Sequence, residues 1–171
     1  TKMLITKEDL DYVWKLITSE SLKGSCATMI FVSNNCDALS ACKILTDLLK
    51  QYNVQYTLVP VFSYKDIQEY LGKDVLSEDI KSLIFLNCGG KEDFTQYWFN
   101  NEEKGIKTFV FEAQRPINHN NVLTQKAVYV IDDGGISLEE CPEDADLEAM
   151  EAEMMNEGEE DIVDGEKEYE M

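Results

Sequence analysis

The sequence has no long apolar run, no paired cysteine motif and only one histidine. No apolar stretch approaches the ~20 residues needed to cross a bilayer, so we expect no membrane-spanning helix. The five cysteines include no CxxC pair, which together with the lone histidine argues against a zinc site. Their odd number favours reduced thiols in an intracellular protein, and the first residues show no signal-peptide pattern.

Basic residues are also few, and the acidic residues are concentrated at the C-terminal end of the sequence. Of the formal net charge of −19, −15 lies in residues 139–171 and −4 in the remainder. We therefore predict an α/β domain over residues 1–138 and an acidic tail over residues 139–171. Three apolar tail residues have helical spacing: Leu147, Met150 and Met154. They predict a helix that docks on the domain, whereas the composition beyond residue 156 predicts disorder. A solubilising role, contact with basic partners and DNA mimicry all fit such a tail.

In the body of the chain, short apolar runs alternate with amphipathic segments. Strands are predicted at residues 26–32, 56–61, 83–88, 107–112 and 127–131. Helices are predicted at residues 7–22, 38–52 and 64–71, and around Phe94, Tyr97 and Trp98. Strands that alternate with helices predict an open, mostly parallel five-stranded α/β sheet flanked by helices.

Polar residues follow four of these strands. They are Asn35-Cys36-Asp37, Asn87-Cys88-Gly89-Gly90, Glu112-Ala113-Gln114-Arg115 and Asp132-Asp133. The ends of parallel strands lie on one rim of a sheet, so these groups could share a cleft. They could equally be ordinary turn formers, because Asn, Asp and Gly favour turns.

The polar set has the outline of a two-metal phosphoesterase site that lacks most of its anions. Such a site holds two cations about 3.5–4 Å apart with carboxylates and histidines. Amides stand at three of the candidate positions, Asn35, Asn87 and Gln114. The remaining candidates, Asp37, Glu112 and Asp132, supply at most three negative charges against four positive ones. We therefore predict a degenerate pocket with no metal or other cofactor.

The two basic candidates near this pocket are Arg115 and His119. Arg115 either pairs with a carboxylate such as Glu112 or Asp37, which is the favoured interpretation, or binds a phosphate. His119 lies beyond Pro116 in an asparagine-rich segment that we predict to be a surface loop, so it is a poor candidate for a ligand.

Four blocks of the chain resemble, in order and spacing, the family of the eukaryotic replication factor cell division control protein 45. They are Cys36–Leu45, Val54–Val61, Leu86–Gly89 and Arg115–Val122. The resemblance spans residues 26–133 and implies a DHH-type α/β domain, related to the phosphoesterases and to the nuclease RecJ. In active relatives an Asp-x-Asp, a central Asp and an Asp-His-His block bind manganese. These positions correspond to Asn35 and Asp37, Asn87, and Glu112-Ala113-Gln114. Only Asp37 is retained outright.

The resemblance implies a catalytically inactive scaffold domain of a nuclear replication factor that joins the MCM hexamer and the GINS complex. The alternative is a manganese-dependent phosphoesterase or single-strand nuclease. A third possibility is direct binding of single-stranded DNA, which we expect to be weak because the body has no dense basic cluster. Four aromatic residues are candidates for partner contacts or for core packing: Tyr64, Tyr97, Trp98 and Phe99.

Overall fold

The computed structural model describes residues 4–21, 27–72, 79–97, 105–123 and 127–136. All of these residues belong to the first of two compact units, which spans residues 1–136. The predicted acidic tail with its helix lies outside the described residues, as do Trp98 and Phe99.

Six strands form a single sheet in the order β1-β6-β5-β4-β2-β3, and every neighbouring pair is parallel. Their bounds are β1 Leu4–Ile5, β2 Ala27–Ser33, β3 Tyr56–Val61, β4 Ile80–Leu86, β5 Lys107–Phe111 and β6 Val128–Ile131. The predicted parallel α/β sheet is confirmed, with one strand more than expected. The added strand, β1, has two residues, too few to show a hydrophobic pattern, and it exists by pairing with β6.

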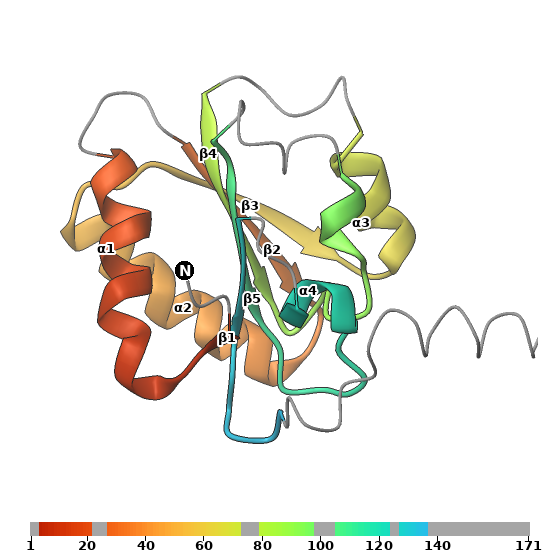
Figure 1. The fold of residues 1–171 in the computed structure, drawn as a ribbon. Coiled ribbons are helices and arrows are strands. Elements are labelled where there is room, and N and C mark those ends of the chain that lie inside the picture. Colours follow the sequence, from red (N-terminus) through yellow and green to blue (C-terminus); the bar gives the residue numbers. More distant parts are fainter. Residues whose placement is uncertain (1–3, 22–26, 73–78, 98–104, 124–126, 137–171) are drawn as a thin grey trace, which may run out of the picture. The chain divides into compact units, whose positions relative to one another are not determined.

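The helices lie on both faces of the sheet: α1 and α2 cover one face, and α3 and α4 cover the other (Figure 1). Their bounds are α1 Leu10–Ser21, α2 Cys36–Gln51, α3 Tyr64–Tyr70 and α4 His119–Leu123. A 3-10 turn, η1 (Lys7–Asp9), precedes α1. Among the described residues, no helix has the length and hydropathy that a membrane span requires.

Two local predictions were wrong. The helix expected around Phe94 is a single 3-10 turn, η2 (Phe94–Gln96). The Asp93 side chain caps its start, and extended backbone at Tyr97 ends it, although the aromatic residues have helical spacing. The asparagine-rich segment after Pro116 was expected to be a loop but forms α4. There the buried Asn121 accepts a hydrogen bond from the Phe94 backbone N–H at 2.9 Å, which anchors this helix to η2.

The strands are buried on both faces, as parallel strands between helices should be. Alternate residues of β2 therefore belong to two different cores. Phe31 packs on the side of α3 and α4, where its ring stacks on Phe85 at a centroid distance of 4.5 Å. Ile30 and Val32 pack on the side of α1 and α2. This double burial holds each strand in place between the helix layers, and the parallel pairing puts the carboxyl ends at one edge of the sheet.

Candidate functional site

Because all strand pairs are parallel, the loops after β2, β4, β5 and β6 emerge at one edge of the sheet, here called the rim. Asn87 connects three of them. Its φ of 52° lies in the left-handed region, which asparagine tolerates. Its backbone N–H donates to the carbonyl oxygen of Phe111 at 2.7 Å. Its Nδ2 donates to Oδ1 of Asn35 at 3.2 Å, and its Oδ1 accepts from the N–H of Ala113 at 3.2 Å.

Asn35 is the N-cap of α2. Its Oδ1 accepts a hydrogen bond from the backbone N–H of Ala38 at 2.8 Å, the usual role of asparagine at this position. Its Nδ2 donates to Oγ of Ser33 at 3.0 Å. With the bond from Asn87, both polar atoms of the Asn35 amide are engaged within the protein.

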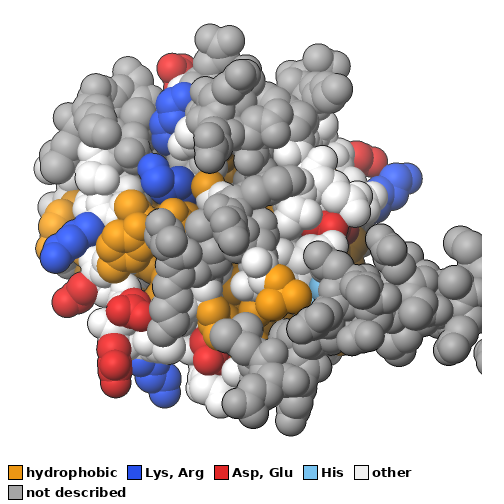
Figure 2. Space-filling model, viewed as in Figure 1, with side chains coloured by type: hydrophobic (Ala, Val, Ile, Leu, Met, Phe, Trp, Pro, Cys, Tyr) orange, Lys and Arg blue, Asp and Glu red, His pale blue; other side chains and the backbone are white. Residues whose placement is uncertain are grey.

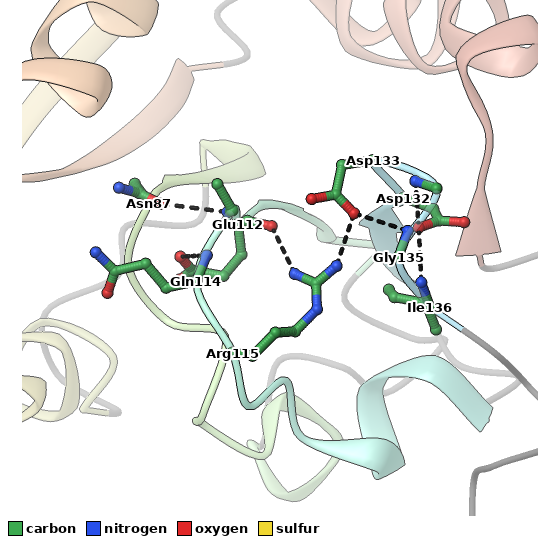
Figure 3. A network of polar contacts seen from close by, with 10 residues as sticks. Asn87, Glu112, Gln114, Arg115, Asp132, Asp133, Gly135 and Ile136 are labelled. Carbon is green, nitrogen blue, oxygen red and sulfur yellow. Dashed lines mark hydrogen bonds and ion pairs between the residues drawn. The ribbon is translucent and has the colours of Figure 1, made fainter.

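Glu112 is a buried carboxylate, with 7% of its surface exposed. Its Oε2 accepts from the N–H of Gly90 at 3.3 Å. Its Oε1 accepts from the N–H of Gln114 at 3.1 Å (Figure 3). A Cβ at Gly90 would lie 2.7 Å from Cγ of Glu112, so only glycine permits this approach. The carboxylate therefore holds the loops after β4 and β5 together. The side chain of Gln114 itself is exposed.

Arg115 pairs with Asp133, not with the carboxylate of Glu112 or with Asp37. Its Nη2 donates to Oδ1 of Asp133 at 2.6 Å, and its Nη1 donates to the carbonyl oxygen of Glu112 at 3.4 Å (Figure 3). The pKa of Asp133 is lowered, first by the N–H of Gly135 and then by the Arg115 guanidinium. This exposed ion pair joins the loops after β5 and β6.

The two remaining acidic candidates differ in their surroundings. Oδ1 of Asp132 accepts from the N–H groups of Gly134 and Ile136 at 2.8 and 3.2 Å, so Asp132 shapes its own loop. Asp37 is exposed in the first turn of α2 and, among the described residues, takes part in no ion pair. His119 begins α4 and is half-buried.

Two clefts flank Asn87 and Glu112, which line both of them. The first has a volume of about 150 Å³ and a wall of polar and apolar residues, with Ser63, Tyr64 and Lys91 among the polar ones. The second has a volume of about 340 Å³ and a mainly apolar wall formed by α2, the start of α1, and the ends of β4, β5 and β6.

The thiol of Cys88 faces the first cleft. Burial, together with the nearby charge of Glu112, raises the pKa of Cys88 to about 12. Its Sγ lies 3.6 Å from the carbonyl oxygen of Phe31, to which the thiol can donate. At neutral pH this thiol stays protonated and is a poor nucleophile.

These donors do not fit a pair of divalent cations. Three of the candidate oxygen donors are amides, from Asn35, Asn87 and Gln114, and both oxygens of Glu112 accept backbone N–H groups. Within the described part of the chain, no three His, Cys, Asp or Glu side chains are grouped closely enough to hold a metal ion. The rim is arranged as a hydrogen-bonded structure that joins four loops.

Sequence reasoning found the rim residues but not their connections. The bond between Asn35 and Asn87 joins residues 52 positions apart, and no local pattern indicates it. The sequence indicates Gly90 only as a turn former, whereas its close contact with Glu112 explains why glycine is needed there. The apolar cleft gave no signal in the sequence, because small residues such as Ala38 and Ala41 create it.

The chain is similar to proteins of one family. A family model described as CDC45 matches residues 28–171. The cell division control protein 45 homolog of Schizosaccharomyces pombe is 36% identical over 136 residues, covering 78% of this chain and 21% of that protein. The homolog of Dictyostelium discoideum is 32% identical over 132 residues, covering 77% and 20%.

A solved structure supports the same fold. The crystal structure of CDC45 from Entamoeba histolytica superimposes with a TM-score of 0.66 at 21% sequence identity, covering 76% of this chain and 25% of that one. The chain thus spans about a fifth of the length of the curated relatives it matches.

Proposed function

Because the chain belongs to the CDC45 family, we propose that it is a catalytically inactive scaffold domain of a DNA replication factor. Its role is to help join the MCM hexamer and the GINS complex in the nucleus. Two features suit it to this role: the doubly covered sheet supplies a rigid core, and the loops and helix faces supply contacts.

The observation that carries this proposal is the hydrogen bond between the Asn35 and Asn87 side chains. Two carboxylates at this distance would repel each other unless a cation lay between them. Two amides instead satisfy each other and need no metal. The side chains of these loops thus serve structure, which supports the proposal of a phosphoesterase fold that has lost its chemistry.

Exposed apolar side chains support a role in protein contacts. Leu39, Leu58 and Phe62 lie around a small cleft between α2 and the edge strand β3, and Phe62 is 76% exposed. On the face seen in Figure 2, hydrophobic side chains reach the surface in patches between charged ones. Apolar and aromatic side chains are typical of the centres of interfaces.

Partner binding is tested directly with purified components. The 171-residue chain, immobilised by one end, should retain the MCM hexamer or the GINS complex of the same species in a pull-down at physiological salt. Phe62→Asp should weaken this retention, and Gln51→Asp, at the exposed end of α2, serves as a charge-matched control. The proposed partners are wrong if neither complex is retained under conditions in which the chain is folded.

The exposed position of Asp37 beside a cleft favours one alternative, a manganese-dependent phosphoesterase or single-strand nuclease. This activity would appear as Mn²⁺-dependent release of nucleotides from single-stranded DNA that disappears in Asp37→Ala. We expect no such release above a metal-free control.

Direct binding of single-stranded DNA is expected to be weak. Such binding needs a basic groove with stacking aromatics. On the visible face in Figure 2, most Lys and Arg side chains are scattered among acidic, apolar and other side chains. Salt-sensitive binding of an oligonucleotide with a dissociation constant on the order of 1 nM would contradict this expectation.

A further inference from the structure

We propose that the mainly apolar cleft at the rim is a docking pocket for a protein segment with one large apolar side chain followed closely by Lys or Arg. This inference rests on the proposed scaffold function and adds to it the chemistry of one partner segment. The cleft is called the apolar pocket below.

The floor of the apolar pocket comes from five elements that meet at the rim. Seven of its wall residues are apolar: Leu10, Ala38, Ala41, Leu86, Phe111, Ala113 and Ile131. The three alanines leave room where longer side chains would fill the space between α2 and the sheet. A volume of about 340 Å³ accommodates a leucine or phenylalanine side chain of a partner. A buried apolar anchor in a preformed pocket is the usual centre of a protein–protein interface.

The edge of the apolar pocket is acidic. Asp37, Asp132 and Asp133 stand at its mouth, with Lys7 as the one basic residue in its wall. An adjoining hollow shares Lys7, Asp132 and Asp133 with it and adds Glu8 and Asp9. The hollow thus presents four carboxylates and one ammonium group next to an apolar floor. The carboxylate of Asp133 is already paired with Arg115, and that of Asp9 accepts a hydrogen bond from Thr6, so the hollow remains acidic mainly through Glu8 and Asp132.

This combination selects the class of ligand. A phosphate or nucleic acid would be repelled by the carboxylates and would find few hydrogen-bond donors on the apolar floor. A second copy of this chain is disfavoured too, because its formal net charge is negative both in residues 1–138 (−4) and in residues 139–171 (−15). A basic protein segment has complementary charge, which speeds association and sets its orientation. Its apolar side chain would enter the pocket while its Lys or Arg lies over the acidic hollow.

The test uses capped six-residue peptides and the ¹⁵N-labelled chain. The probe contains one leucine followed two residues later by two arginines. One comparison peptide has alanine in place of leucine, and another has glutamates in place of arginines. The probe should shift the amide signals of Ala41, Ala113 and Ile131, and both comparison peptides should bind at least tenfold more weakly.

Matched variants test whether the probe peptide binds in the apolar pocket. Ala41→Trp fills the apolar pocket from an exposed helix position and should weaken the probe at least tenfold. Ser40→Trp, one residue away and outside the pocket wall, should leave it unchanged. Asp37→Lys should weaken the arginine probe without affecting a neutral leucine peptide. The proposal is wrong if the probe peptide binds Ala41→Trp as tightly as the wild-type chain. It is also wrong if the probe shifts no amide signals of the wild-type chain, or if an oligo-dT strand shifts the same signals equally.

The outcome separates this inference from the scaffold proposal. If the peptides fail but the chain still retains MCM or GINS, only the pocket assignment is wrong. If the peptides bind in the pocket but neither complex is retained, the pocket assignment is supported and the proposed partners are wrong.

Discussion

In the middle of the sheet, Phe31, Phe85 and Phe109 are fully buried between two layers of helices. At the rim of the same sheet, Asn35 and Asn87 are only half-buried and are held by hydrogen bonds between loops. Burial of large apolar side chains contributes most of the folding free energy, whereas each hydrogen bond adds a modest net amount. The strands are thus positioned by packing that does not depend on the rim.

This difference means that the shape of the rim depends little on its own side chains. The strands that position the rim loops are held by packing elsewhere, so most substitutions at the rim should have small effects on the fold. Glu112 is the exception, because it lies within the buried layer and accepts two backbone N–H groups. The contrast between interior and rim can be tested by substitutions in each.

The largest expected effect is in the interior. Phe85→Ala removes a ring that packs on both Phe31 and Phe94 at centroid distances of 4.5 Å. It should lower the free energy of unfolding by about 3–5 kcal/mol, measured by urea denaturation. Phe62→Ala, at an exposed position, should change it by less than about 0.5 kcal/mol. Equal losses in the two variants would show that the sheet is not packed as described.

Gly90→Ala tests the one buried carboxylate at the rim. The added methyl group would displace Glu112 and break its hydrogen bond to the Gly90 N–H. We expect a loss of about 1–3 kcal/mol in the free energy of unfolding. In a Glu112→Ala background the same substitution should cost clearly less, because the clash is gone. Additive losses in the double-mutant cycle would contradict the contact.

Asn87→Asp should have a smaller effect. It replaces the donor to Asn35 Oδ1 by a carboxylate oxygen, while aspartate still tolerates the left-handed backbone. The free energy of unfolding should fall by about 1 kcal/mol. Asn53→Asp is a matched control at an exposed asparagine with a φ of 56°, and it should be nearly neutral. If both variants behave alike, the amide bridge contributes nothing.

The smallest effect concerns the exposed ion pair. Asp133 has a lowered pKa, so its contribution to stability is present above the ordinary aspartate pKa and is lost as pH falls through the lowered value. Arg115→Gln should raise the pKa of Asp133 only in part, because the Gly135 N–H remains bonded. A carbon-detected NMR titration of the Asp133 carboxyl group measures this shift. An unchanged pKa would mean that the pair does not form in solution.

The sequence predicted the interior better than the rim for a physical reason. A run such as residues 27–33 shows its double burial in its own composition, so β2 was found within one residue at each end. Strand β1 was missed because two residues carry no pattern without their partner, β6. The partner of Arg115 depends on the path of the loop after β6, 18 residues away, and composition does not encode that path.

We propose that the rim is a hydrogen-bonded scaffold and not a two-metal site. This proposal can be tested by isothermal titration of Mn²⁺ into the 171-residue chain at neutral pH. We expect no site with a dissociation constant tighter than on the order of 1 mM. Two sites on the order of 1 μM, lost together in Asp37→Ala, would contradict it.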